Sequence, residues 1–262
     1  MHVIDLSKPV QDNPNAPSFL RIKIKPHRRF VSKLLLRVLG LPFGLMPEDF
    51  EGWGDETIRK LGVHATTHID APSHYGPMSQ GEVAPTVDQI PLEQCIGPGV
   101  VLDMSGKEEG DPITVRDVQD ELARIGGSIT SGTIVLVRTD RDRFHHQRDF
   151  WKRGTGMSAA ATEWLIDRGS TVMGIDQWTW DVPFHYQIAR AKAEKRRNLF
   201  WEAHRVGLRK RYWHMEQLTN LAALPPTGFT VHVLPLKLVG ASAAPARVIA
   251  VLDEPVGESA AD

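Results

Sequence analysis

The chain has 262 residues, and its 31 Lys and Arg residues almost balance its 32 Asp and Glu residues, which leaves a net charge of −1 with His neutral. This balance excludes a protein whose whole surface carries a basic footprint for nucleic acid, and 41% hydrophobic residues exclude a disordered chain. The single cysteine, Cys95, excludes a disulfide framework and a cysteine-based metal cluster.

The predicted elements alternate between strands and helices along the chain. Residues 2–6 alternate apolar and polar side chains and predict a strand, whereas residues 8–19 contain three prolines and predict a loop. Residues 30–41 carry apolar side chains at helical spacing and predict a short amphipathic helix. The alternation predicts an α/β fold, and no linker divides residues 1–262 into more than one domain. Further strands are predicted over 99–104, 133–138, 171–175 and 230–239, and further helices over 115–125, 159–168 and 184–206.

No targeting or membrane segment is visible in the sequence. The first residues form neither a basic stretch nor a long apolar one, and no segment has the ~18 or more apolar residues of a membrane span. We therefore expect a cytoplasmic protein that acts on a small-molecule substrate, with neither a membrane nor a nucleic acid as partner.

One short segment concentrates the groups that can carry chemistry. Three histidines and a carboxylate, His64, His68, Asp70 and His74, follow the spacing H-x3-H-x-D-x3-H. Neutral imidazole and carboxylate are the usual ligands of Zn²⁺, Mn²⁺ and Fe²⁺. In an extended chain His68 and Asp70 would lie ~6.6 Å apart, close enough for one ion, whereas His64 and His68 would lie ~13 Å apart. A shared ion therefore requires a bend before His68, and Pro72 could turn the chain so that His74 also returns to it.

His204 and Glu216 are candidates for a second metal position. Twelve residues on one continuous helix would separate them by ~18 Å and place them on different faces. Gly207 offers a place for such a helix to stop, after which the chain could return. Spacing alone leaves open whether the two side chains meet.

On these residues the sequence resembles the cyclase family of metal-dependent hydrolases, which includes kynurenine formamidases and isatin hydrolases. The family pattern is roughly H-x-G-T-H-x-D-x-P-x-H, followed later by H-x11-E, and the resemblance extends over most of residues 60–252. It implies a three-layer swivelling β/β/α fold, assembled as homodimers or homotetramers, with one or two divalent ions, zinc or manganese, per chain. By this resemblance one ion is held by His64, His68 and Asp70, a second is held by Asp70, His204 and Glu216, and His74 is the catalytic proton-transfer residue.

The sequence also departs from the family pattern. Thr66 stands where the family usually has Gly, and residues 7–20 lack the Trp of the formamidase signature, which disfavours formylkynurenine as the substrate. Residues 19–60 resemble an insertion that reshapes the pocket. Asp176, Trp178 and Trp180 are candidate substrate-binding residues, although packing in the core is the commoner role of such tryptophans.

Three functions are compatible with this pattern. The first is a metal-dependent hydrolase that opens an amide, lactam, imide or N-formyl C–N bond of a small, aromatic or cyclic substrate through metal-activated water. The second is a polyketide-type cyclase or lyase, which would use the same metal with His74 as the base. The third is a metal-binding or scaffold protein without catalysis, and the presence of His74 argues against it. The sequence hardly separates the first two functions, and the hydrolase is our prediction with the cyclase as the alternative.

Overall fold

The computed structural model describes residues 2–14, 16–26 and 28–252. Contacts divide the chain into two compact units, one formed by the residues up to Pro9 together with those from Val63 onward, and the other by Val10–Gly62. All candidate metal ligands belong to the first unit, which we call the catalytic unit. The second is the extension unit, and residues 19–60, which we expected to be an insertion, lie within it.

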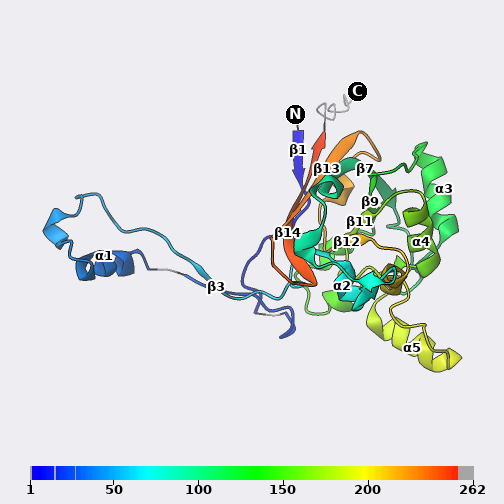
Figure 1. Ribbon diagram of the computed structural model, residues 1–262, viewed down its shortest axis with the longest axis horizontal. Helices are drawn as coiled ribbons and strands as arrows, with labels where there is room; N and C mark the ends of the chain where they lie inside the picture. Colours follow the sequence, from blue (N-terminus) through cyan, green and yellow to red (C-terminus); the bar gives the residue numbers. More distant parts are fainter. Residues whose placement is uncertain (1, 15, 27, 253–262) are drawn as a thin grey trace. The chain divides into compact units, whose positions relative to one another are not determined.

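The catalytic unit is built on a sheet that closes on itself (Figure 1). The strand order is β1-β14-β13-β7-β9-β11-β12-β4, and β4 also pairs with β14, so that seven strands form a barrel-like ring to which β1 is added. The three pairings among β7, β9, β11 and β12 are parallel, and the others in this sheet are antiparallel. The strands are β1 (His2–Asp5), β4 (His68–Asp70), β7 (Ile96–Asp103), β9 (Ile134–Arg138), β11 (Val172–Ile175), β12 (Trp213–Glu216), β13 (Phe229–Pro235) and β14 (Ala243–Leu252).

Helices cover one face of the parallel strands, and short elements connect the rest. Helices α3 and α4 lie side by side against this face (Figure 1). The helices of this unit are α2 (Pro72–Tyr75), α3 (Val115–Ile125), α4 (Ala159–Asp167) and α5 (Phe184–Glu194), and its two-residue strands are β5 (Met78–Ser79), β6 (Glu82–Val83), β8 (Pro112–Ile113) and β10 (Gly156–Met157). Its 3₁₀ turns are Val87–Gln89, Leu92–Cys95, Arg141–Phe144, Phe150–Lys152, His204–Leu208 and Leu221–Ala223.

The parallel strands separate two apolar cores, because successive side chains of a strand point to opposite faces. In β9, Ile134 and Leu136 lie in the core inside the ring, whereas Val135 and Val137 lie in the core beneath the helices. Burial on both faces explains why these strands are almost continuously apolar rather than alternating with polar residues. The inner core also contains apolar residues of β13 and β14, so the ring is filled by side chains.

Most predicted elements are confirmed, with ends shifted by one to three residues. Helix α3 has the predicted bounds, and the Ser158 hydroxyl caps α4 by accepting the N–H of Ala161 at 3.2 Å. The strand predicted over 230–239 is shorter, because β13 ends at Pro235. The helix predicted over 184–206 is wrong beyond Glu194, since Lys195 adopts a left-handed φ of 49° that ends the helix.

The mixed α/β class is confirmed, and it takes the form of a barrel-like sheet with helices on one side. The three-layer swivelling β/β/α arrangement implied by the resemblance stays a prediction. None of the helices in the described part of the chain combines the length and apolar character that a bilayer span requires.

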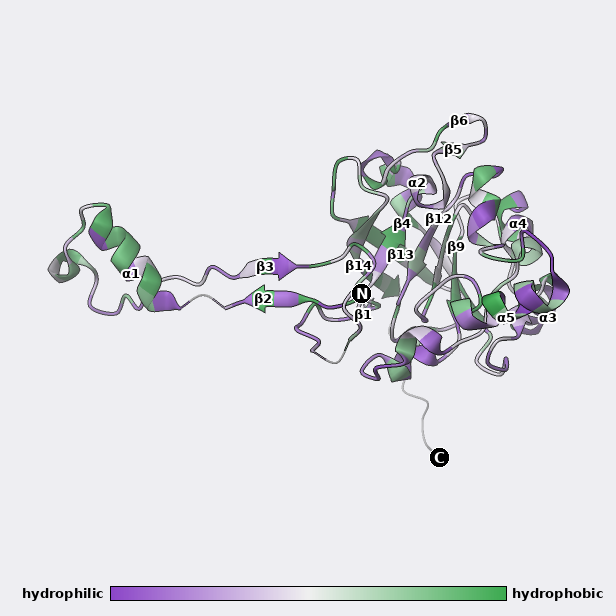
Figure 2. Cartoon of the chain, turned by 90° about the horizontal axis from the view of Figure 1, so that it is seen from below, coloured by the Kyte–Doolittle hydropathy of each residue, from purple (hydrophilic) through white to green (hydrophobic). Residues whose placement is uncertain are grey.

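The extension unit contains helix α1 (Arg29–Val38), the short antiparallel pair β2 (Lys23–Lys25) and β3 (Thr57–Lys60), and the 3₁₀ turn Phe43–Leu45. The amphipathic helix predicted over 30–41 is confirmed as α1, which is largely apolar along its length (Figure 2). Several of its apolar side chains are exposed, namely Phe30, Val31, Leu34, Leu35 and Val38.

Candidate metal centre

Two short strands bring the central side chains of the site together. Strands β4 and β12 run antiparallel with His214 opposite Asp70 and Glu216 opposite His68. Residues directly opposite each other in such a pair project from the same face, so all four side chains gather on one side of the sheet. On each strand, the side chain that lies between the two site residues points into the apolar core inside the ring.

The chain bends on both sides of β4, as the predicted shared ion requires. His64 lies in the turn before the strand, with its ring centroid 4.8 Å from that of His68 and its Nδ1 3.0 Å from Asp70 Oδ1. Pro72 begins α2, which places His74 Nε2 3.7 Å from Asp70 Oδ2. The three histidines of the predicted motif therefore surround the Asp70 carboxylate.

The second predicted pair also meets at this place. His204 lies in the turn His204–Leu208 and Glu216 at the end of β12, and His204 Nε2 is 3.5 Å from Glu216 Oε1 and 3.9 Å from Asp70 Oδ2. The residues between them form no continuous helix, so the chain can return in the way that the sequence left open. All six predicted metal and proton-transfer residues thus lie in one cluster.

The proton positions on two imidazoles are determined by their neighbours. His68 Nδ1 lies 2.7 Å from the Thr66 carbonyl oxygen, which can only accept, so Nδ1 carries a proton, and in the neutral ring Nε2 has the lone pair. His204 Nδ1 lies 2.5 Å from the Asp181 carboxylate, with the same consequence for its Nε2. In this neutral form both Nε2 lone pairs face carboxylates. His68 Nε2 is 3.3 Å from Asp70 Oδ1, and His204 Nε2 is 3.5 Å from Glu216 Oε1.

These contacts leave buried polar atoms that a cation would satisfy. His68 Nε2 and both carboxylate oxygens of Asp70 are buried without a hydrogen-bond partner within the described ranges. Unpartnered buried polar atoms are rare in folded proteins because each costs free energy. A divalent ion between His68 Nε2 and the Asp70 carboxylate would give all three atoms a partner. The residues present therefore fit a metal ion.

The electrostatics of the two acids agree with this reading. Burial raises the pKa of Asp70, but the imidazoles of His64, His74 and His68 lower it further, so that the net pKa lies well below the usual value. Burial likewise raises the pKa of Glu216, and a hydrogen bond with His214 contributes to a net lowering. Both side chains are therefore carboxylates at neutral pH.

His214 and Asp181 belong to the site but were not among the predicted residues. His214 Nε2 lies 3.3 Å from Asp70 Oδ2 and 3.1 Å from Glu216 Oε1, and these contacts raise its pKa to about 9 against the lowering effect of burial. The sequence contained a signal for His214, because residues 214 and 216 of a strand share one face. Asp181 has no comparable signal, because its role depends on a tertiary contact with His204.

The predicted substrate-binding residue Asp176 lies in a different setting. Its buried carboxylate accepts the backbone N–H and the hydroxyl of Thr139 and the backbone N–H of Asp140. It thereby joins the end of β11 to the segment after β9. No contact described for Asp176 joins it to the cluster, and its role in substrate binding stays a prediction.

The two predicted tryptophans differ in their positions. Trp180 is fully buried, its backbone N–H donates to Glu216 Oε1 at 2.7 Å, and its ring stacks on that of His214 with centroids 5.3 Å apart. Trp180 therefore helps to hold the side chains of Glu216 and His214 in position. Trp178 has edge contacts with the rings of Trp151 and Phe184.

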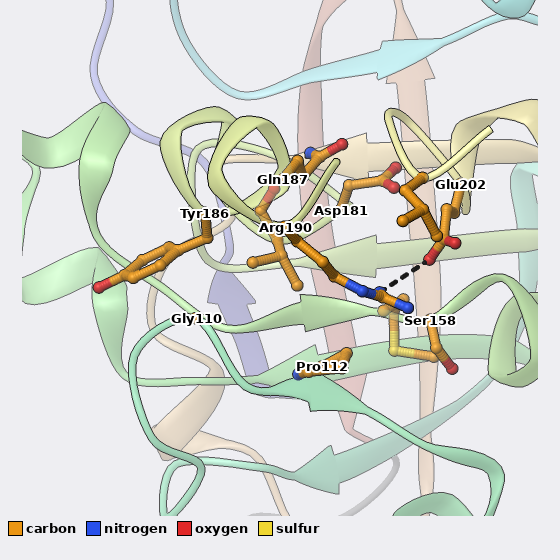
Figure 3. Close-up of a pocket in the computed structure, with 11 residues that line it drawn as sticks. Gly110, Pro112, Ser158, Asp181, Tyr186, Gln187, Arg190 and Glu202 are labelled. Atoms are coloured by element: carbon orange, nitrogen blue, oxygen red, sulfur yellow. Dashed lines mark hydrogen bonds and ion pairs between the residues drawn. The ribbon is translucent and has the colours of Figure 1, made fainter. Parts of the chain in front are cut away.

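A pocket of about 180 Å³ has Asp181 in its wall, together with Gly110, Tyr186 and Arg190 (Figure 3). Arg190 pairs with Glu202 across it, with 3.3 Å between the charged atoms. None of the described candidate metal ligands lines this pocket. Asp181 does line it and also contacts the imidazole of His204, so this residue connects the pocket wall to the cluster.

The described residues offer two groups that could hold a metal ion. The inner group is wholly buried, and the outer group has partly exposed imidazoles. The inner group consists of Asp70, His204, His214 and Glu216, and the outer group of His64, Asp70 and His74.

Comparison with known proteins gives a consistent result. A family model named Cyclase and described as "Putative cyclase" matches residues 4–182. A kynurenine formamidase of Paracidovorax citrulli is 30% identical over 193 residues, which is 72% of this chain and 76% of that protein. An isatin hydrolase of Roseibium aggregatum is 26% identical over 212 residues, 73% of each chain. The solved structure of isatin hydrolase A from Ralstonia solanacearum is 25% identical, with a TM-score of 0.72 over 96% of this chain and 92% of that one.

Proposed function

Because the chain belongs to the Cyclase family, we propose that it is a metal-dependent hydrolase of a C–N bond in a small amide, lactam, imide or N-formyl compound. Two relatives that match along most of their length are named as a hydrolase and a formamidase. The observation that carries the proposal is the orientation of His68 and His204, whose Nε2 atoms face Asp70 and Glu216.

The donor set defines which residues would hold the metal. His64, His68 and Asp70 would hold one ion, and Asp70, His204 and Glu216 a second, with Asp70 shared. Imidazole nitrogen and carboxylate oxygen suit zinc and manganese, and we propose one of these as the native metal. A divalent ion bound there would polarise the scissile carbonyl and lower the pKa of water.

His74 is the residue best placed to move a proton. Its side chain is 23% exposed, so a substrate can reach it, and it lies on the solvent side of Asp70. We propose that it accepts a proton from the attacking water and returns it to the leaving nitrogen.

Trp201 offers an apolar surface for the substrate beside His74. Its ring centroid is 5.1 Å from that of His74, and the same ring stacks on His204 at 4.5 Å. An aromatic wall next to the proton-transfer residue favours a flat aromatic or cyclic substrate.

The proposal is tested with protein that has been stripped by a chelator and reloaded with Mn²⁺ or Zn²⁺. The substrates are a panel of N-formyl aromatics, isatin-like lactams and cyclic imides. We expect hydrolysis of at least one compound, lost on stripping and restored on reloading. A folded, metal-loaded protein that hydrolyses none of them would contradict the proposal.

The family description, "Putative cyclase", supports a cyclase as the second candidate, and we propose that this would be a polyketide-type cyclase or lyase. The same cluster could polarise a carbonyl while His74 removes a proton from carbon. Mass spectrometry of the products separates the two functions, because the hydrolysis products together have the mass of the substrate plus one water, whereas ring closure adds no water.

A further inference from the structure

His214 has contacts that distinguish it from an ordinary buried histidine. Its Nε2 lies 3.3 Å from Asp70 Oδ2 and 3.1 Å from Glu216 Oε1. Bonds of about 2.1 Å at tetrahedral angles place two donor atoms of one ion about 3.4 Å apart. His214 Nε2 therefore has, from each of the two carboxylate oxygens, the spacing of two ligands of a single metal ion.

The ring of His214 is held in one orientation by its neighbours. Its plane is nearly parallel to the ring of Tyr75, with centroids 5.5 Å apart, and it also stacks on Trp180. A Cβ on Gly207 would overlap the Tyr75 ring, so the glycine is required for Tyr75 to occupy this place. Stacking on several rings prevents His214 from turning its Nε2 away from the two carboxylates.

The second ring nitrogen of His214 has a partner that permits metal binding. Nδ1 lies 2.9 Å from the Tyr75 hydroxyl, which can accept a hydrogen bond as well as donate one. When Nδ1–H donates to this oxygen, Nε2 has the lone pair, as it does in His68 and His204. Ligating histidines usually have such a partner on the nitrogen away from the metal.

We propose that His214 is a metal ligand and that it completes a four-donor inner position with Asp70, His204 and Glu216. Four protein donors are typical of closed, structural zinc sites, whereas catalytic sites keep one position open. The outer position at His64 and Asp70 then keeps the open coordination site, in agreement with the 32% exposure of His64. An ion at the inner position would stabilise the site, and an ion at the outer position would meet the substrate. This inference rests on the proposed metal-dependent function.

The test is a titration of chelator-stripped full-length protein with Co²⁺, followed by visible absorption and by the metal-to-chain ratio. The wild type is expected to bind two cobalt ions, the first more tightly and with the intense absorption of a four-coordinate site. In His214→Gln, which keeps a hydrogen-bond donor but removes the imidazole, we expect the tighter affinity to fall at least 100-fold. Tyr75→Phe removes the hydroxyl group that contacts Nδ1 of His214, and it should lower the same cobalt affinity about 10–100-fold.

A folded His214→Gln protein that keeps both cobalt affinities within threefold would overturn the inference and would make His214 a hydrogen-bond donor only. A wild type that binds no cobalt would instead overturn the proposed function. Should His214→Gln fail to fold, His214→Cys provides a direct readout, because a thiolate ligand gives a sulfur-to-cobalt absorption band that the wild type lacks. Folded, cobalt-loaded His214→Cys protein without this band would also overturn the inference.

Discussion

At the scale of single residues, the orientations of the His68 and His204 imidazoles each depend on an oxygen atom that accepts a hydrogen bond from Nδ1. The Thr66 carbonyl fixes His68, and the Asp181 carboxylate fixes His204. In both rings the hydrogen bond occupies Nδ1 and leaves Nε2 for a metal. Such partners commonly change metal affinity by about 10–100-fold when they are removed.

Asp181 allows this dependence to be measured. Its carboxylate accepts the backbone N–H groups of Ala203 and His204 as well as the imidazole proton, so Asp181→Asn should misorient the ring. We expect metal affinity, measured by competition with a chelator, to fall about 10–100-fold. Asp176→Asn is the matched control, since it alters a buried carboxylate that accepts backbone N–H groups away from the cluster. Equal affinities in the two variants would contradict the positioning role.

His74 should be separable from the metal ligands. In His74→Ala we expect kcat to fall about 10²–10⁴-fold with an unchanged metal-to-chain ratio, because only the proton-transfer group is removed. Asp70→Ala, the comparison variant, should lose metal because this carboxylate is shared by the imidazoles around it. Normal turnover of purified His74→Ala would remove the assigned role, and loss of metal from it would make His74 a ligand.

The residue pattern predicted most of the cluster but not all of it. Four of its members lie within eleven residues, so local spacing was enough to find His64, His68, Asp70 and His74. His204 and Glu216 depended on the family resemblance, because the turn that joins them has no regular spacing. His214 was overlooked although it stands two residues before Glu216, since the strand that aligns them has only four residues.

At the scale of elements, the site depends on strands that the sequence pattern did not predict. Strand β4 has three residues and pairs with β12 on one side and β14 on the other, and neither partner was among the predicted strands. The parallel strands β7, β9 and β11 were predicted because burial on both faces makes them largely apolar. Sequence patterns thus located the scaffold, whereas the pairings that assemble the site are tertiary.

The junction between β9 and β11 predicts a pH dependence of stability. Burial is the largest effect on Asp176 and raises its pKa from 3.8 to about 7, although hydrogen bonds from Thr139 and Asp140 oppose it. Between these pH values the folded protein holds a proton that the unfolded chain has released. The free energy of unfolding should therefore fall as pH rises from about 4 to 7, by up to about 1.4 kcal/mol per pH unit from this group, and then level off.

Asp176→Asn cannot ionise and should lack this contribution. We expect its free energy of unfolding in urea to change less steeply than that of the wild type between pH 5 and pH 7. The other titrating groups are common to both proteins and cancel in the comparison. Parallel curves for the two proteins would contradict the assigned pKa.

At the scale of the whole molecule, the candidate ligands all lie in the catalytic unit, and none lies in Val10–Gly62. The extension unit can therefore be shortened without removing any candidate ligand. Lys25 and Thr57 stand opposite each other in the antiparallel pair β2–β3, so an Asn-Gly turn can replace residues 26–56. We expect this shortened chain to keep the wild-type metal-to-chain ratio, measured by elemental analysis. A loss of bound metal would show that the catalytic unit does not hold the ion alone.

The central claim is that imidazoles and carboxylates from distant parts of the chain converge on shared divalent ions. It is tested most directly by anomalous X-ray scattering at the zinc absorption edge from crystals of zinc-loaded protein. We predict anomalous peaks within bonding distance, about 2.0–2.2 Å, of His68 Nε2, His204 Nε2 and Asp70 carboxylate oxygens. A map from fully zinc-loaded, ordered protein with no peak at these atoms would contradict the account.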